Sequence, residues 1–408
     1  MRVLYFHQHF ATPQGSGGTR SYEFARALVA RGHQVTMVCG AHAQAGLSLR
    51  WDDAAGWARG DVDGIDVISL PLAYSNRDSL PRRGWTFCRF AGRAVALALT
   101  EPCDLVFATS TPLTAALPGL AARWLRGKPF VFEVRDLWPE LPRALGVRNP
   151  CLLGAMSLLE WAAYRGADAC VGLSPGIVAG ITRRAPAGRT VALIPNGCDL
   201  ERFHPRLRGP MGLPGVQPGD FVAGFTGAHG PANGLDALLD VARELRRRGD
   251  RRVKLAFIGD GKEKDRLAET ARQEGLDNCL FYGPVPKEAL GPITSSLGCG
   301  LMVLKDVPAF YDGTSPNKFF DYAAAGLPVV NNYPGWLAGL IREFGAGVVV
   351  PPGDATAFAD ALQALAADPD RCRRYGAAAR ALAERRFDRA DQAADFVELL
   401  EAVGQRLS

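Results

Sequence analysis

A lysine and an aspartate three residues apart begin a helical pattern in the last third of the chain. Lys318 and Asp321 follow a turn that contains Ser315 and Asn317, and an apolar run over 323–330 comes next. The first turn of a helix presents unpaired backbone N–H groups and a positive dipole end, an arrangement that binds phosphate groups. We therefore expect Ser315, Asn317 and Lys318 to hold a diphosphate. Asp321, one turn further along, is expected to accept hydrogen bonds from ribose hydroxyls.

Glycines gather between the first expected strand and the first expected helix. Gly15, Gly17 and Gly18 lie within four positions, which allows the backbone to approach a phosphate closely. A loop for a nicotinamide dinucleotide would follow the strand directly, and an acidic residue would end the second strand. Here the glycines come several residues later, and the second strand ends at Gly40. The pattern therefore disfavours a nicotinamide cofactor.

Ionisable residues gather at the expected carboxyl ends of strands in the first half of the chain. Arg135 and Asp136 end a strand over 129–134, Glu140 follows, and His9 lies in the loop after the first strand. Ligands of open parallel sheets bind at these strand ends, so we expect Arg135 and Asp136 to take part in catalysis. His9 and Glu140 are candidates for contacts with the acceptor or the sugar. A salt-bridged strand end and a structural histidine are the alternatives.

Apolar runs of strand length alternate with helical patterns along the whole chain, which is typical of parallel α/β folds. In the first half we expect strands near 2–6, 34–39, 65–70, 104–109, 129–134, 168–173 and 190–194. In the second half they are expected near 221–226, 253–258, 279–282, 299–303, 328–331 and 347–350. The prediction is two Rossmann-like, doubly wound domains whose strand ends face a cleft. The expected parts are residues 1–195, residues 196–386 and a C-terminal helix over 387–408.

The composition bounds the class of protein. The 408 residues are 48% hydrophobic and 22% charged, with a formal net charge of +5, which is ordinary for a globular protein of two domains. The nine cysteines stand singly and at no metal-ligand spacing, so we predict no metal site. No apolar stretch reaches the roughly 18 residues of a membrane-spanning helix. No signal sequence precedes the first strand, and we expect a cytoplasmic protein.

The segment over 314–330 resembles the donor motif of retaining GT-B glycosyltransferases of family 4. In that motif two glutamates are separated by seven residues, and Ala-x-Gly-x-Pro-Val follows the second one. Aligning the motif with this chain places the second acid at Asp321. Gly17 and Gly18 resemble the paired glycines of the family at the donor diphosphate, and 195–197 resembles its interdomain segment. The resemblance implies a GT-B fold whose C-terminal helix crosses back to the first domain. It also implies a retaining, metal-independent transferase that uses a UDP-sugar as co-substrate and no cofactor.

The motif departs from the family at its first acid. Gly313 occupies the position of the first glutamate, which in the family holds a hydroxyl of the donor sugar. Asp312, one residue earlier, is a candidate for that contact. The alternative, which we favour, is that the position has changed with the donor sugar.

The loop after the first strand of the second half departs from the family as well. The family's arginine and lysine for the diphosphate are absent, and His229 and Asn233 occupy the region. Charge that develops on the leaving phosphate must still be met by cations or backbone dipoles. We nominate Lys318 and Lys305 as replacements, assisted by the backbone around Gly227.

The run Arg135-Asp-Leu-Trp-Pro-Glu140 looks like that of a subgroup that attaches amino-deoxy sugars such as N-acetyl-fucosamine in O-antigen or capsule synthesis. This resemblance implies a lipid-linked saccharide acceptor and an enzyme on the inner face of the cytoplasmic membrane. Two other functions stay open: a GT-B sugar-nucleotide epimerase, and a catalytically inactive nucleotide-binding partner protein. The lost family residues suggest the second of these.

Arginines and aromatic residues are mixed in a helical pattern over 82–93. The segment contains Trp85, Phe87, Phe90 and four arginines, three of which fall near one helical face. We expect the aromatic side chains to reach the lipid headgroups and predict reversible attachment to an anionic membrane surface. The alternative is a domain helix whose arginine stems cover apolar surface. No RNA-binding signature accompanies the basic residues, so we predict no nucleic-acid partner.

Overall fold

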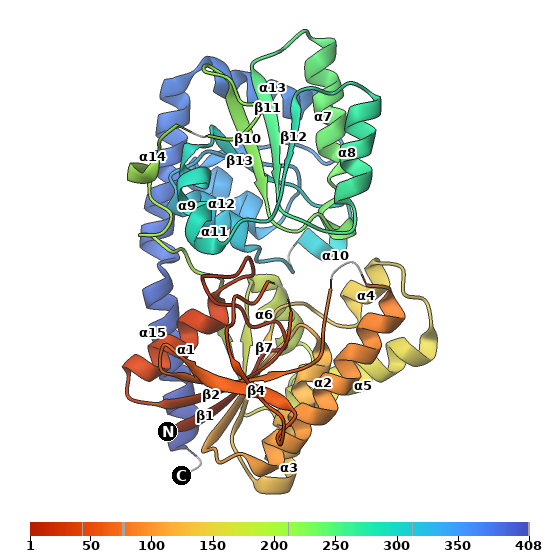
Figure 1. Cartoon of the computed structure of the whole chain (residues 1–408), viewed down its shortest axis with the longest axis vertical. Helices are drawn as coiled ribbons and strands as arrows, with labels where there is room; N and C mark the ends of the chain where they lie inside the picture. The colour runs from red at the N-terminus through yellow and green to blue at the C-terminus, as the bar shows by residue number, and fades with distance from the viewer. Residues whose placement is uncertain (43, 76–77, 211, 312, 407–408) are drawn as a thin grey trace. The chain divides into compact units, whose positions relative to one another are not determined.

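The two α/β patterns of the sequence form two sheets, each in its own unit of the chain (Figure 1). The computed structural model describes residues 1–42, 44–75, 78–210, 212–311 and 313–406. Unit 1 consists of Met1–Pro195, Gly313–Ser315 and Ala390–Ser408, and unit 2 of Asn196–Asp312 and Pro316–Arg389. Within the described residues, no helix has the length and apolar character needed to cross a bilayer.

Among the described residues, the sheet of unit 1 has nine strands in the order β3-β4-β5-β2-β1-β6-β7-β8-β9. They are β1 (Arg2–Phe6), β2 (Gln34–Gly40), β3 (Arg50–Asp52), β4 (Trp57–Val62), β5 (Ile65–Leu70), β6 (Leu105–Thr109), β7 (Phe130–Val134), β8 (Ala169–Gly172) and β9 (Thr190–Leu193). All except β3 and β4 pair in parallel. These parallel strands agree with the strands expected for the first half.

Strands β3 and β4 extend the sheet by antiparallel pairing, which the sequence analysis missed. β4 joins β5 through the two-residue turn Asp63-Gly64, in which the φ angles are 52° and 84°. A turn with two positive φ angles matches the twist of paired antiparallel strands, and Asp-Gly is a favoured sequence for it. This dipeptide was the available signal for the hairpin.

Helices cover both faces of this sheet. They are α1 (Arg20–Ala30), α2 (Leu80–Thr100), η1 (Leu113–Ala115), α3 (Ala116–Arg126), α4 (Glu140–Ala144), α5 (Pro150–Gly166), α6 (Pro175–Thr182) and α15 (Arg389–Gln405). Helices α2, α3 and α5 share one apolar core, to which Phe90, Leu120 and Tyr164 contribute. Helices α1 and α15 pack on the other face, where Phe396 stacks on Phe24 with ring centroids 4.6 Å apart. The C-terminal helix is therefore part of the core of unit 1.

A buried ion pair fixes the start of α1 against the sheet. The Arg20 side chain is 1% exposed and donates to one oxygen of Glu133 in β7, through Nε at 3.0 Å and Nη2 at 2.7 Å. The other Glu133 oxygen accepts a hydrogen bond from Thr109 Oγ1 at 2.7 Å. Arg20 also donates to the carbonyl oxygens of Ile194 and Pro195. One guanidinium thus joins the start of α1, strand β7 and the segment after β9.

In unit 2 the described strands form a parallel sheet of six, in the order β12-β11-β10-β13-β14-β15. They are β10 (Phe221–Thr226), β11 (Val253–Ile258), β12 (Cys279–Tyr282), β13 (Cys299–Met302), β14 (Val329–Asn331) and β15 (Gly347–Val349). All six agree with the strands expected for the second half. Because every pairing is parallel, the carboxyl ends of the strands lie at one edge of the sheet.

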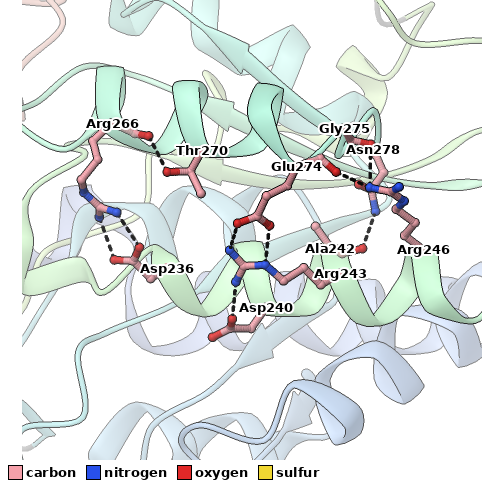
Figure 2. Close-up of polar contacts among 10 residues, drawn as sticks. All are labelled: Asp236, Asp240, Ala242, Arg243, Arg246, Arg266, Thr270, Glu274, Gly275 and Asn278. Atoms are coloured by element: carbon pink, nitrogen blue, oxygen red, sulfur yellow. Dashed lines mark hydrogen bonds and ion pairs between the residues drawn. The ribbon is translucent and has the colours of Figure 1, made fainter.

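The helices of unit 2 also lie on both faces of their sheet. They are η2 (Pro205–Leu207), η3 (Pro231–Asn233), α7 (Asp236–Arg247), α8 (Lys264–Gln273), α9 (Lys287–Ser296), α10 (Pro308–Tyr311), α11 (Asn317–Ala324), α12 (Trp336–Phe344), α13 (Ala355–Ala367) and α14 (Pro369–Arg386). Helices α7, α8 and α13 share one apolar core, and α9, α11, α12 and α14 share the other. Ion pairs along their length join α7 to α8 (Figure 2). Arg266 lies 2.8 Å from both oxygens of Asp236, and Arg243 contacts Glu274 at 2.6 and 2.7 Å.

The two ends of unit 2 are joined to each other. Cys198 and Asp388 form a parallel bridge, and the Arg389 side chain donates to Gly197 O at 2.7 Å. Nε of Arg389 also lies 2.6 Å from Asp199, in a pair whose side chains are 8% and 10% exposed. The turn-rich segment after unit 1 is therefore a loop that is anchored by a buried ion pair.

Replacing Glu133 by Gln should destabilise unit 1 strongly. The change leaves the Arg20 charge buried without its counter-charge, which typically costs about 3–5 kcal/mol. Asp66→Asn is the control, because Asp66 forms an exposed pair with Arg59, with side chains 38% and 42% exposed. That change should cost about 0–1 kcal/mol. Urea unfolding followed by circular dichroism measures both, and equal losses of stability would contradict the role given to Arg20 and Glu133.

Candidate functional site

Lys318 lies in the first turn of α11, half-buried beside two uncharged groups. Its ammonium is 3.9 Å from the ring centroid of Phe225 and 3.3 Å from Oδ1 of Asn233. Burial disfavours the charged form and lowers the pKa of Lys318 from 10.5 to about 7. An aromatic face and an amide oxygen stabilise a cation without neutralising it. The charge of Lys318 is therefore available to an anion.

Gly227 provides the space beside Lys318. Its φ is +125°, and a β-carbon there would lie 3.4 Å from Cε and 3.8 Å from Nζ of Lys318. A β-carbon at Gly259 would in turn collide with the carbonyl oxygen of Gly227. The N–H of Gly227 already donates to Ile258 O at 2.9 Å. The lack of a side chain at Gly227 leaves room for Lys318, and assistance to a phosphate from the backbone around Gly227 stays a prediction.

His229 places a neutral ring in this loop. The ring is buried, with its centroid 6.0 Å from that of Phe225 and 6.3 Å from that of Phe257. Burial lowers the pKa of His229 to about 4, and the charges of Lys264 and Lys318 contribute to the shift. Across the described residues, neither ring nitrogen has a hydrogen-bond partner. His229 is uncharged at neutral pH and does not replace a phosphate-binding arginine.

Lys305 lies against the other end of the same loop. A β-carbon at Gly234 would lie 2.8 Å from Cα of Lys305, so the two backbones are in close contact. The Lys305 side chain is exposed and borders a cavity of about 370 Å³. Its lining also includes Gly230, Asp236, Arg266 and Asn332. Because Asn233 and Gly234 are consecutive, this one loop contacts both Lys318 and Lys305.

Asp321 has a partner that the sequence analysis missed. Both of its carboxylate oxygens lie 2.7 Å from Nζ of Lys287, the first residue of α9. The Asp321 and Lys287 side chains are 5% and 7% exposed, and Nζ is 4.5 Å from the ring centroid of Phe203. Burial raises the pKa of Asp321, and Lys287 opposes the rise. Asp321 is thus paired within unit 2, and its expected contact with a ribose stays a prediction.

The residues before Lys318 lie around the start of α11. Asn317 is the first residue of the helix and is half-buried. Ser315 is also half-buried and belongs to the short segment grouped with unit 1. Asp312 lies outside the described residues. The contacts of these side chains with a donor stay predictions.

In unit 1, Arg135 follows β7 and contacts a buried histidine that follows β1. Its Nη1 lies 3.2 Å from Nε2 of His7, and its backbone N–H donates to Ser110 Oγ at 2.9 Å. A guanidinium only donates hydrogen bonds, so Nε2 of His7 accepts and the imidazole is neutral. Burial lowers the pKa of His7 well below its ordinary value, and the charge of Arg135 lowers it further. His7 therefore positions the Arg135 side chain, a role that the sequence analysis did not assign.

Asp136 and Glu140 have different surroundings. Asp136 accepts a hydrogen bond from Thr111 Oγ1 at 2.8 Å, and burial raises the pKa of Asp136. Glu140 begins α4 and pairs with Arg184, which also lies 2.8 Å from Glu160. A carboxyl group with a raised pKa is suited to proton transfer. Glu140 is held in a salt bridge, which is the alternative that the sequence left open.

His9 lies among aromatic rings. Its ring centroid is 4.4 Å from that of Tyr74, 6.0 Å from that of His42 and 6.2 Å from that of Phe87. Burial lowers the pKa of His9 to about 3, and the neighbouring His42 and Arg135 contribute. The neutral imidazole can exchange hydrogen bonds with a hydroxyl but carries no charge at neutral pH. Its contact with an acceptor stays a prediction.

Close packing inside unit 1 accounts for part of the glycine loop. A β-carbon at Gly17 would lie 2.7 Å from that of Ala11, and one at Gly15 would collide with the carbonyl oxygen of Gln44. Gly17 and Gly18 are half-buried and come just before α1. Packing alone requires Gly15 and Gly17, so these glycines are not by themselves a sign of phosphate binding. The donor contacts of Gly17 and Gly18 stay predictions.

Two family models match the chain, one in each half. Residues 15–197 match the glycosyl transferase 4-like domain. Residues 214–382 match the glycosyl transferases group 1. The two matches follow each other in the order that the sequence analysis expected.

Curated relatives match over part of their length. The chain is 31% identical over 194 residues to a D-inositol 3-phosphate glycosyltransferase of Nocardia farcinica, which covers 46% of this chain and 42% of the relative. It is 29% identical over 236 residues to the protein of that name from Xylanimonas cellulosilytica, covering 53% of this chain and 52% of the relative. The alignments thus span about half the length of these relatives.

Solved structures match over nearly the whole chain. A sucrose-phosphate synthase from Thermosynechococcus elongatus aligns with a TM-score of 0.76 at 21% identity, covering 99% of both chains. Anabaena HepE in complex with UDP and glucose aligns with a TM-score of 0.68 at 18% identity, covering 98% of this chain and 100% of that one. At such identities the likeness concerns the fold. The expected GT-B architecture of two Rossmann-like α/β domains is confirmed.

The pKa of Lys318 predicts how anion binding depends on pH. Only the ammonium attracts an anion, so affinity should be highest below about pH 7 and fall up to about tenfold per pH unit above it. The probe is a diester of pyrophosphate, whose charge is constant between about pH 6 and pH 9. In Lys318→Arg the side chain stays charged, so the pH dependence should flatten. Calorimetry at several pH values measures the affinity, and a pH-independent affinity of the parent would contradict this assignment.

The Lys287 and Asp321 pair allows its structural contribution to be separated from ligand binding. Asp321→Asn alone should destabilise unit 2 by about 3–5 kcal/mol, because it leaves a buried ammonium unpaired. The double change Lys287→Met with Asp321→Leu removes both charges and should restore most of that loss. Urea unfolding measures the stability. If Asp321→Asn were as stable as the parent, the ion pair would not contribute to the stability of unit 2. If the folded double variant bound the nucleotide as tightly as the parent, Asp321 would not contact the ribose.

Proposed function

Because the chain belongs to the GT-B glycosyltransferases that join a 4-like domain to a group 1 domain, we propose that it transfers a sugar from a UDP-sugar with retention of configuration and without a metal ion. The observation that carries the proposal is the half-buried ammonium of Lys318. It lies at a helix start beside Phe225 and Asn233, and both of these neighbours are uncharged. A leaving diphosphate would supply a negative charge, which the described neighbours of the Lys318 ammonium do not.

The transfer step depends on stabilising the leaving group. Charge develops on the diphosphate as the glycosidic bond breaks, and a fixed cation in a partly desolvated site stabilises that charge more than water does. Lys318 is this cation in our proposal. Lys305, exposed at the other end of the Asn233-Gly234 loop, provides a second positive charge. A bound diphosphate also favours the ammonium form of Lys318, so donor binding takes up a proton near neutral pH.

Unit 1 is proposed to bind the acceptor and take part in the reaction. Arg135 is held at a strand end by His7 and presents a positive charge there. Asp136 has a carboxyl group of raised pKa with a hydroxyl partner, Thr111. We assign Asp136 to proton exchange with the attacking hydroxyl of the acceptor. His9 is proposed as a neutral hydrogen-bond partner of the acceptor.

We further propose that the acceptor is a lipid-linked saccharide and that the transferred sugar is an N-acetylated amino-deoxy hexose. The support for both is the run over 135–140, which resembles transferases of surface polysaccharide synthesis. The curated relatives are named for D-inositol 3-phosphate instead. The proposed acceptor and the proposed sugar therefore both rest on the run over 135–140 alone.

A lipid-linked acceptor requires a contact with the membrane, and we propose that α2 provides one on the inner face of the cytoplasmic membrane. Arg82, Arg89 and Arg93 are exposed on this helix, as the proposal needs. Trp85 is 66% exposed, whereas Phe90 is fully buried in the core of unit 1. Our expectation that all the aromatic side chains reach the headgroups is corrected, because Phe90 faces the sheet.

The proposed function predicts UDP binding and a loss of turnover in Lys318→Ala. Charge-assisted contacts contribute about 1.5–3 kcal/mol, so turnover should fall about 10- to 150-fold. Lys254→Ala is the control, because Lys254 lies near the amino end of β11, at the opposite edge of the sheet. Calorimetry with UDP and mass spectrometry of the products measure binding and reaction. Turnover within twofold of the parent in Lys318→Ala would contradict the diphosphate site.

The same measurement separates the alternative functions. Extension of an added saccharide indicates a transferase. A new sugar-nucleotide isomer formed without acceptor indicates an epimerase, and nucleotide binding without turnover indicates an inactive partner protein. If neither UDP nor any other nucleotide bound, the proposed function would be wrong.

A further inference from the structure

Three helices on one face of the sheet of unit 1 expose tryptophan side chains. Trp85 of α2, Trp124 of α3 and Trp161 of α5 are 66%, 63% and 50% exposed. These helices pack on the same apolar core and form one layer of unit 1 (Figure 1). Tryptophan combines a large apolar ring with a polar N–H, which suits the boundary between water and lipid.

Helix α5 is apolar on its outer side as well as on its inner side. The outer side carries Cys151, Ala155, Leu158, Trp161 and Arg165 at spacings of three or four residues, and the Leu158 side chain is 65% exposed. A helix that is apolar all round is usually enclosed by protein or lipid. The inner side of α5 packs on the core of unit 1, and its outer side has no covering in this chain among the described residues.

Helix α3 contacts the C-terminal end of α5 through residues beside its exposed Trp124. Arg123 of α3 lies 3.0 Å from Asp168, just after α5. A β-carbon at Gly166, the last residue of α5, would lie 3.6 Å from the ring of Trp124. Leu125, next to Trp124, is 71% exposed. We call Trp124, Leu125, Leu158 and Trp161 the α3–α5 patch.

The helices that carry and flank the patch are basic, although two acidic residues beside them, Asp78 and Asp168, pair with Arg82 and Arg123. Helices α2, α3 and α5 contain arginines at 82, 83, 89, 93, 123, 126 and 165, and their only acidic residue is Glu160. Glu160 is 2% exposed and is bound by Tyr164 and Arg184. The Arg165 guanidinium lies 4.8 Å from the ring centroid of Trp161, at the edge of the patch. Two copies of this surface would repel each other, whereas an anionic bilayer complements it.

We propose that the α3–α5 patch inserts into the headgroup boundary of an anionic lipid bilayer. The proposal rests on the proposed function, in which the acceptor is attached to a lipid. It adds an apolar contact to the electrostatic contact of α2. Apolar insertion does not weaken with salt, whereas attraction through exposed arginines is screened. The two contacts can therefore be measured separately.

The experiment is sedimentation of the full chain with vesicles of phosphatidylcholine and phosphatidylglycerol, at low salt and at about 1 M salt, where the Debye length is roughly 3 Å. The patch variant replaces the four patch residues by Ser. The control variant carries Trp51→Ser and Leu193→Ser, at residues 52% and 44% exposed elsewhere in unit 1. A third variant carries Arg82→Gln, Arg83→Gln, Arg89→Gln and Arg93→Gln in α2. Urea unfolding and UDP binding of each protein are measured alongside.

The patch variant should partition onto vesicles about tenfold more weakly than the parent at both salt concentrations, while the control variant matches the parent. The α2 variant should bind more weakly than the parent at low salt and equally at high salt. Equal binding of the parent and the patch variant, or no binding of the parent, would overturn the inference. So would a concentration-dependent dimer of the parent that the patch variant lacks. UDP binding without vesicle binding would refute this inference alone, whereas vesicle binding without nucleotide binding would refute the donor site alone.

Discussion

A charge removed from water needs a counter-charge, and the buried ion pairs that meet this need anchor the candidate site segments in both units. In unit 1, Arg20 follows the glycine loop directly, and Glu133 comes two residues before Arg135. Their pair sets the distance between the glycine loop and the end of β7. In unit 2, Asp321 lies one turn after Lys318, and its pair with Lys287 holds α11 in place. Each unit thus fixes its reactive groups through a neighbouring ion pair.

Lys318 differs from these paired charges, because an aromatic ring and an amide stabilise it. Desolvation lowers the pKa of Lys318 to about 7, and no carboxylate among the described residues pairs with its ammonium, whereas Lys287 pairs with Asp321. A paired lysine would have to break its ion pair before it could bind a phosphate, at a cost in affinity. Among the residues that the structure describes, Lys318 has no such pair to break. The two lysines lie in the same unit, and their partners explain why one is structural and the other is suited to an anion.

In unit 1 the sheet separates two kinds of surface. The residues with candidate chemical roles, Arg135 and Asp136, lie at the carboxyl end of β7, where the backbone leaves the sheet. The exposed tryptophans lie on the outer sides of helices that cover one face. The two regions are nevertheless linked, because Arg184 pairs with Glu140 at the start of α4 and with Glu160 of α5.

The sequence by itself determined the architecture, because alternation of strands and helices depends on neighbours within a few residues. The parallel strands, the helix that begins at Asn317 and the loop with Gly227 and Asn233 were all predictable in this way. The β3–β4 extension was missed, although Asp63-Gly64 signalled it.

The tertiary structure decided which charged side chains are paired with an opposite charge. Arg20 and Glu133 are 113 positions apart, and Lys287 and Asp321 are 34 apart. No local pattern links such residues, because packing brings them together only after the sheets have formed. For that reason the sequence suggested both Lys318 and Asp321 as ligand-binding groups. In the described part of the chain, the fold pairs Asp321 with Lys287 and gives Lys318 only uncharged partners.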